Sequence, residues 1–406
     1  MTEPLPLRRN RDFLLLQAGQ LLSTFGSAMS SIAYPLLALA VTGSAAKTGY
    51  VGAVMFVPLL LLSPVAGVAV DRFDRRKVMI VSDAAGAAAV GALAAAVLSH
   101  HAPYWLILLV AGVDSAATSF FRAGTSGAFK AVVPQARLAD AASVSLARMS
   151  AVRLAAPPVG GALFGLSRAL PFLADAISYA FSTASLLLMR TRFQEAREPG
   201  AHTRFREGLA YFWRIPFLRV TTAMIAPSNL AASGAPIAVI VLAREHGLSS
   251  AAIGGLVALQ GAALLAGSTV SPLLRRIFPM RAILLSEFWS ALVFASFLVY
   301  PNVYVLAAAA SVHAFWFPNT DSAMMAYSYA LIPDRLLGRA MAASYTLRAV
   351  AAPIGPLAAG LLLTHTSPRL TIVALVTPVV AAAVVGTLSA SIRDLPSLEA
   401  SPAAAG

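Results

Sequence analysis

Nine charged side chains lie inside apolar runs of this sequence, and they are the residues best able to do chemistry there. If these runs cross a membrane, each unpaired charge costs about 2.5–3.5 kcal/mol at mid-depth, so the charges must pair or face water. A carboxyl group that meets an arginine in one state and water in another can bind and release a proton. The nine are Asp83, Asp114, Asp175, Glu287, Asp321, Arg122, Arg148, Arg153 and Arg348.

Asp114 is the strongest candidate for proton chemistry. It shares one helical face with Thr118 and Arg122, at i, i+4 and i+8. Asp114 and Arg148 are predicted at similar depth on adjacent helical arms, which favours an ion pair between them. We group Arg122 and Arg153 with this pair as candidate coupling residues. A purely structural buried pair is the alternative, and structural or gate-closing roles are favoured for the acids at 83, 175 and 287.

Composition indicates that the runs do cross a membrane. Of 406 residues, 58% are hydrophobic and only 12% are charged, against about 25% charged in soluble domains. There is no cysteine, which excludes disulfides and thiol chemistry, and the histidines lack metal-ligand spacing. Runs of about 20 apolar residues predict twelve spans. They cover 13–41, 47–70, 78–99, 103–125, 138–165, 168–190, 217–243, 250–274, 279–300, 302–328, 336–364 and 368–391.

The basic residues predict how these spans are oriented. With both termini in the cytoplasm, 22 of the 30 lysines and arginines fall in cytoplasmic segments and four in external loops. This bias follows the positive-inside rule. The net charge of +13 therefore indicates topology and attraction to anionic lipid, not a nucleic-acid partner.

The sequence also carries signs of an internal duplication. Four landmarks of the first half recur in order about 200 residues later, among them Ser82-Asp83 with Ser286-Glu287 and Ala155-Ala-Pro157 with Ala351-Ala-Pro353. The predicted organisation is a six-helix bundle over 1–190, a cytoplasmic linker with a short interfacial helix over 191–216, a second six-helix bundle over 217–392 and a disordered tail over 393–406.

A charged loop between the second and third spans carries the most specific motif. It reads Gly67-Val-Ala-Val-Asp71-Arg72-Phe-Asp74-Arg75-Arg76 and resembles the G-x-x-x-D-R-x-G-R-R loop of the major facilitator superfamily, with aspartate in place of the second glycine. The resemblance covers residues 8–391 and implies an all-α fold of two pseudo-symmetric six-helix bundles. Asn10-Arg-Asp-Phe13 and Asp175-Ala-Ile-Ser-Tyr179 look like the branch that contains siderophore and macrolide exporters.

The resemblance implies a gating role for this loop. Asp71 would face the end of a helix in the other half, while Arg72, Arg75 and Arg76 would anchor the loop at the inner surface. Gly67 would let neighbouring backbones approach closely. A loop that only sets topology is the alternative.

A second motif lies in the fifth span. Arg153-Leu-Ala-Ala-Pro157-Pro158-Val-Gly160-Gly161 resembles the G-P-x-x-G-G element of facilitator antiporters, with alanine for the first glycine. Proline removes a backbone hydrogen bond and paired glycines allow close packing, so this helix is predicted to bend. An ordinary packing seam is the alternative.

Polar and aromatic residues gather on four spans. In the superfamily the first, fourth, seventh and tenth helices line the central cavity, so we expect a mixed polar and aromatic substrate cavity here. Helix packing by the Ser/Thr stripe of the first span is the alternative. The predicted lining is Gln17, Gln20, Thr24, Ser27, Tyr34, Thr118, Asn229, His313, Trp316, Phe317, Asp321 and Arg348.

Together these features predict a secondary transporter of the bacterial cytoplasmic membrane that exports a small amphipathic organic compound, such as a drug, antibiotic or siderophore, in exchange for protons. The expected partners are that substrate, protons and membrane lipid, with no cofactor, no metal, no nucleic acid and a monomeric state. An importer of a nutrient with the same fold is the alternative. A polytopic enzyme or sensor is a remote one, because we find no clustered acids or histidines at a membrane face.

Overall fold

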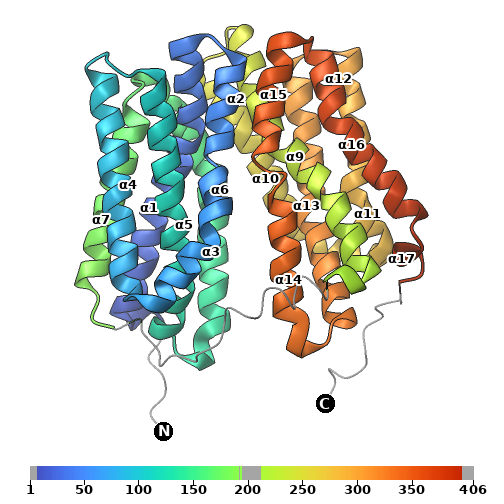
Figure 1. Ribbon diagram of the computed structural model, residues 1–406, viewed down its shortest axis with the longest axis horizontal. Helices are drawn as coiled ribbons and strands as arrows, with labels where there is room; N and C mark the ends of the chain where they lie inside the picture. Colours follow the sequence, from blue (N-terminus) through green and yellow to red (C-terminus); the bar gives the residue numbers. More distant parts are fainter. Residues whose placement is uncertain (1–6, 192, 194–211, 396–406) are drawn as a thin grey trace. The chain divides into compact units, whose positions relative to one another are not determined.

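The computed structural model describes residues 7–191, 193 and 212–395, and within these ranges the regular structure is helical. The first half runs through six predicted spans (Figure 1). Its helices are η1 (Leu7–Arg9), α1 (Arg11–Thr42), α2 (Ala45–Val54), α3 (Val57–Arg72), α4 (Arg75–Leu98), α5 (Tyr104–Val132), η2 (Gln135–Arg137), α6 (Leu138–Leu166) and α7 (Leu170–Leu188). Helices satisfy their backbone polar groups internally, as a lipid environment requires.

The second half repeats this plan. Its helices are α9 (Pro216–Glu245), α10 (Ser250–Ile277), α11 (Met280–Ser290), η3 (Ala291–Phe294), α12 (Ala295–Val299), α13 (Val303–Leu331), α14 (Asp334–Ala349), α15 (Ile354–His365), α16 (Pro368–Leu388) and α17 (Ala390–Arg393). In the described residues, eleven helical segments are long and apolar enough to cross a membrane. The remaining predicted span is α13, a helix of 29 residues whose mean hydropathy is lowered by polar residues such as His313, Asn319 and Asp321.

The proline motif of the fifth span lies within one helix. Pro157 and Pro158 are inside α6, which stays helical from Leu138 to Leu166. The corresponding segment of the second half interrupts its span, because α14 ends at Ala349 and α15 begins at Ile354 after Pro353. The Ala-Ala-Pro landmark is thus compatible with a continuous helix in one half and a break in the other.

Local signals fix several helix ends. Asn10 caps α1 by accepting the Phe13 N–H at 3.0 Å, and its amide donates to the Val132 carbonyl at the end of α5 at 2.8 Å. Gly43 ends α1 with φ +63°, a left-handed conformation that glycine adopts without strain. Asp74, which replaces the usual motif glycine, caps α4 by accepting the N–H groups of Arg76 and Lys77 at 2.9 and 3.3 Å.

We expect Asp74→Ala to destabilise the protein by about 1 kcal/mol, the usual effect of losing an N-cap side chain. Asp140→Ala is the matched control. Asp140 is an exposed acid whose partner Arg137 lies one turn away at 3.3 Å, and exposed pairs contribute little. Thermal unfolding of both purified variants checks this, and equal midpoints would contradict the capping role.

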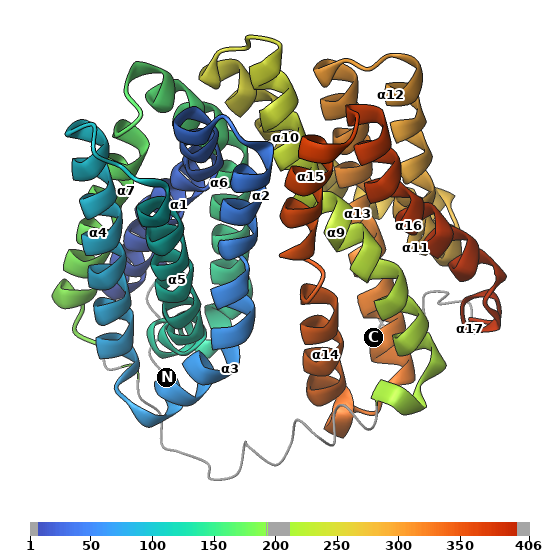
Figure 2. The same cartoon turned by 45° about the horizontal axis from the view of Figure 1, so that its top comes forward.

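The chain folds as two compact units, Met1–Glu198 with Ile240–Ala258, and Pro199–Val239 with Leu259–Gly406. In the first unit α1 packs along α7 and α6, and α4 lies between α5 and α7 (Figure 2). Small residues permit the α1–α7 contact: a side-chain carbon added at Gly19 would lie 3.1 Å from Ser185 Cβ, and one added at Gly26 would lie 2.9 Å from Ser178 Cβ.

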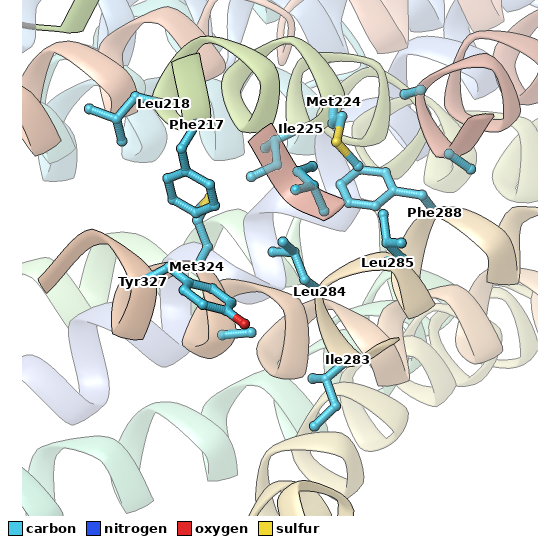
Figure 3. Packing of buried hydrophobic residues seen from close by; sticks show 14 of the residues in the cluster. Phe217, Leu218, Met224, Ile225, Ile283, Leu284, Leu285, Phe288, Met324 and Tyr327 are labelled. Carbon is cyan, nitrogen blue, oxygen red and sulfur yellow. The ribbon is translucent and has the colours of Figure 1, made fainter. Parts of the chain in front are cut away.

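The second unit has its own apolar core, shown in Figure 3. Phe217 and Met224 of α9, Leu284 and Phe288 of α11 and Tyr327 of α13 are among its members, and each is at most 3% exposed. The core joins α9, α11 and α13, so it fixes the helices that carry Asn229, Glu287 and His313. The predicted linker of 191–216 and the tail of 393–406 lie mostly outside the described residues.

Candidate functional site

Asp114 lies at the centre of a buried polar network in the first unit. Its carboxyl group accepts hydrogen bonds from two tyrosines, from Tyr34 of α1 at 3.1 Å and from Tyr179 of α7 at 2.6 Å. Asp114 is 8% exposed and the two tyrosines 1% and 3%. Three helices therefore meet at one carboxyl group that is shielded from the surroundings.

A second carboxyl group belongs to the same network. The Ser27 hydroxyl of α1 lies 2.9 Å from the Tyr179 hydroxyl and 3.5 Å from Asp175 Oδ1. Asp175 is fully buried and accepts a further bond from Ser178 at 3.3 Å, while its Oδ2 atom has no hydrogen-bond partner among the described residues. Hydroxyl groups thus connect Asp114 to Asp175 through Tyr179 and Ser27, and hydroxyls both donate and accept protons.

The predicted ion pair between Asp114 and Arg148 is wrong for this structure. Arg148 instead donates to Gln20 Oε1 at 2.6 Å. Gln20 and Tyr34 are 14 residues apart on α1, which corresponds to about 21 Å along a helix at 1.5 Å per residue. The prediction assumed equal depth for the two side chains, and their partners on α1 show that the depths differ.

The other predicted coupling residues also stand apart from Asp114. Arg122 and Arg153 are exposed, and Thr118 is half-buried. Of the first-span stripe, Gln17 bonds to Ser145 of α6 at 2.9 Å and Thr24 to the Gln20 carbonyl at 2.5 Å. The stripe therefore divides between helix packing and the Asp114 network, with Ser27 and Tyr34 in the network.

The charged loop is held mainly by its arginines. Arg75 bonds to the Phe193 carbonyl at 3.3 Å and Arg76 to the Leu187 carbonyl at 2.7 Å, so both bind the chain at the end of α7. Asp71 is 59% exposed and lies 3.7 Å from Arg75, which is a weak surface pair. A carbon added at Gly67 would meet no described atom within 4 Å, so the close approach expected there is not present among the described residues.

Arg72 lines a cavity of about 790 Å³ between α3, α4 and α5 in the first unit. Phe73, Lys77 and Phe120 are further lining residues. None of the residues predicted to bind substrate lines this cavity.

Glycines of the fifth-span motif do lie at close contacts. A carbon added at Gly160 would lie 2.9 Å from the Met29 backbone of α1, and one added at Gly161 would lie 3.1 Å from Gly254 Cα in the same unit. Larger side chains at these positions would push neighbouring backbones apart. This is the geometry expected of a packing seam.

In the second unit the predicted cavity residues differ in their burial and in their partners. Asn229 donates to the Arg348 carbonyl at 3.0 Å and Arg348 donates to Ser344, while Asp321 is exposed. Trp316 and Phe317 of α13 are half-buried. His313 differs, because it is 5% exposed and packs against α9 and α11.

Polar residues of α7 belong to the network as well, and the sequence carries a signal for them that was not used. Asp175, Ser178, Tyr179, Ser182 and Ser185 follow helical spacing on one face, and all five are buried. A polar face on a membrane helix must point inward, so these residues could have been placed beside Asp114. Asp12 was also missed. It accepts the Arg190 and Thr191 N–H groups at 3.0 and 2.7 Å and ties the start of α1 to the end of α7.

Metal binding has no candidate site in the part of the chain that the structure describes. No group of three or more His, Asp or Glu side chains is arranged there to hold an ion. The buried carboxyl and hydroxyl groups of the first unit can exchange protons and form hydrogen bonds.

Several relatives are described as efflux proteins. The chain is 27% identical to the multidrug efflux pump Tap of Mycobacterium tuberculosis over 416 aligned positions, covering 95% of each protein. It is 29% identical to macrolide efflux protein A of Streptococcus pyogenes over 154 residues, and there the match spans only 38% of either chain.

Solved structures agree on the fold. A bacterial homologue of the iron transporter ferroportin, in an inward-facing state, superimposes with a TM-score of 0.73 at 18% identity, covering 94% of this chain and 98% of that one. A nucleoside transporter gives a TM-score of 0.74 at 11% identity, covering 91% and 98%. The family model of the Major Facilitator Superfamily matches residues 17–288. The chain is a multi-pass membrane protein that belongs to the Major Facilitator Superfamily.

Proposed function

We propose that this transporter exports a small amphipathic organic compound, of which a macrolide is the first candidate, from the cytoplasm in exchange for protons. The observation that carries the proposal is the buried network of Asp114, Tyr34, Tyr179, Ser27 and Asp175 across α1, α5 and α7. The efflux relatives named above support the direction and the substrate class.

Protonation of Asp114 would change the contacts between helices. The carboxyl group accepts from Tyr34 at one oxygen and from Tyr179 at the other. Once protonated, one oxygen gains an O–H donor and becomes a weaker acceptor than a carboxylate oxygen. The bond between that oxygen and its tyrosine is then weakened or reversed in direction, which loosens the hold of α1 or α7 on α5. The proton thereby biases the first unit between two arrangements, which is what coupling to alternating access requires.

The substrate would meet a mixture of polar and aromatic side chains. In this proposal Asn229, Trp316, Phe317, Asp321 and Arg348 of the second unit contribute to its binding, while His313 is removed from the set because of its burial. Asp71 and the arginines of its loop would close the inner gate. The protein would act as a monomer in the bacterial cytoplasmic membrane with both termini inside.

Accumulation of a radiolabelled macrolide in a pump-deficient bacterial host tests this function. Cells that express the protein are expected to hold less drug than vector controls, and a protonophore should restore the control level. More drug in expressing cells would instead identify an importer. Unchanged accumulation of macrolides and of other amphipathic drugs would contradict export.

A further inference from the structure

A second buried cluster, outside the proposed coupling network, lies in the second unit. It contains Ser228 of α9, Glu287 and Ser290 of α11 and His313 of α13. Ser228 bonds to Glu287 Oε1 and lies 3.2 Å from His313 Nε2, while Nε2 is 3.8 Å from the same carboxylate oxygen. Ser228 is fully buried, Glu287 is 2% exposed and His313 is 5% exposed.

The hydrogen bonds around His313 Nδ1 determine whether this nitrogen carries a proton. His313 Nδ1 lies 3.1 Å from the Glu287 carbonyl oxygen and 3.1 Å from Ser290 Oγ. The Ser290 hydroxyl donates to the Glu287 carbonyl at 2.5 Å, so its hydrogen is already used. A carbonyl oxygen only accepts. Nδ1 must therefore carry a hydrogen and act as the donor.

Two arrangements satisfy both hydrogen bonds of Ser228 on the other side of the ring, and they differ by the net transfer of one proton between Glu287 and His313. If the Ser228 hydroxyl donates to Glu287, a hydrogen bond between Nε2 and Ser228 needs a hydrogen on Nε2, which makes His313 an imidazolium beside a carboxylate. If Glu287 is protonated and donates to Ser228, then Ser228 donates to a neutral Nε2. Ser228 remains neutral in both, because it receives one proton as it passes its own on.

We propose that Glu287, Ser228 and His313 form a proton-relay site in the second unit, in addition to the Asp114 network of the first. In the relay, Glu287 gives its proton to Ser228 Oγ while the Ser228 proton moves to His313 Nε2, and the reverse movement restores the neutral pair. Loss of the shared proton leaves a carboxylate and a neutral imidazole, and gain of a second proton leaves a carboxylic acid and an imidazolium. This inference rests on the proposed proton-coupled transport and adds a second proton-binding site to it.

The sequence repeat supports the assignment independently. Ser228 corresponds to Ser27, Glu287 to Asp83 and His313 to Asp114, with offsets of 201, 204 and 199 residues. In the first unit Ser27 and Asp114 share one network, through Tyr179. Both halves of the chain thus place titratable groups at equivalent positions on equivalent helices.

The surroundings of the relay contain a further charged residue. Asp321 lies on α13 eight residues after His313, and the neighbouring Thr320 hydroxyl donates to the Ile283 carbonyl of α11 at 3.2 Å. The Phe294 ring packs edge-on against the His313 ring, with centroids 6.2 Å apart.

Infrared difference spectroscopy of the purified full-length protein in lipid vesicles, titrated with pH, tests the relay without any substrate. In the unaltered protein the carbonyl band of a protonated carboxylic acid and the ring bands of an imidazole should change in one step. Glu287→Gln should remove the carboxylic acid from that step, and His313→Gln should remove the imidazole. Ser228→Ala should separate the two signals, while Asp114→Asn should leave the joint step in place.

Ser228→Ala removes only one hydroxyl group, so its infrared titration still tests the relay if the Glu287→Gln variant does not fold. A joint step that survives Ser228→Ala, or an imidazole signal indifferent to Glu287→Gln, would overturn the proposal. In vesicles that transport a macrolide, Glu287→Gln should lower the number of protons exchanged per drug by one, and an unchanged ratio would also overturn it. If the protein shows the joint infrared step but no efflux that a protonophore stops, the proposed function is wrong and the relay site still stands.

Discussion

Asp114→Asn is expected to abolish proton-driven macrolide export while leaving the protein folded in the membrane. Asparagine has the shape of aspartic acid and can still bond to the hydroxyls of Tyr34 and Tyr179, which hold the native carboxylate at 3.1 and 2.6 Å. The asparagine side chain cannot gain or lose a proton at any pH at which the protein is folded. Coupling between two ligands typically changes affinity by about 5- to 150-fold, and this pH-dependent change in drug affinity should disappear.

Drug binding to the purified protein at several pH values, together with transport in vesicles, checks this expectation. Asp140→Asn, an exposed acid of α6, is the control and should behave as the unaltered protein does. A structural role for Asp114 predicts something different, namely less folded protein but unchanged transport per molecule. Export by Asp114→Asn at the normal rate and with the normal pH dependence would remove Asp114 from the mechanism.

Gly26→Leu is expected to unfold much of the first unit. A side-chain carbon at this position would lie 2.6 Å from Asp175 Oδ1 and 2.9 Å from Ser178 Cβ, inside the contact of α1 with α7. Overpacking typically destabilises by about 1–3 kcal/mol. Here the added side chain must also displace a fully buried carboxyl group and its hydrogen bonds, so we expect an effect at or above the upper end of that range.

Gly165→Leu is the matched control for this substitution. Gly165 is also a helical glycine, but a carbon added there meets no described atom within 4 Å. Fluorescence-detected size-exclusion chromatography after heating should show early loss of Gly26→Leu and near-normal behaviour of Gly165→Leu. Equal stability of the two variants would mean that α1 and α7 do not pack as described.

Much of the fold could be predicted because lipid permits few solutions. Apolar runs of about 20 residues between charged loops can only be helices, and their ends agree with the structure within a few residues for α1, α4 and α7. The breaks were harder to predict. Pro157 and Pro158 leave α6 continuous, whereas the span that contains Pro353 is divided, because neighbouring packing decides whether a lost backbone bond is tolerated.

The site was predicted less completely. Sequence spacing gives the depth of a side chain in the membrane only approximately, and it shows which residues share a face of one helix but not which faces of two helices meet. Asp114 and Tyr34 were both identified as candidates, and the structure joins them. Arg148 was assigned to the wrong partner, because the relative depth of two helices depends on the length and path of their connections. His313 was expected at a cavity, although its burial against Glu287 follows only from packing between α11 and α13.

Macrolide uptake into everted membrane vesicles, energised to an acid interior, tests the central claim most directly. We predict uptake that stops when a protonophore dissipates the proton gradient and that is absent in vesicles carrying Asp114→Asn. Uptake that continues at the same rate after the protonophore is added would contradict proton-coupled export.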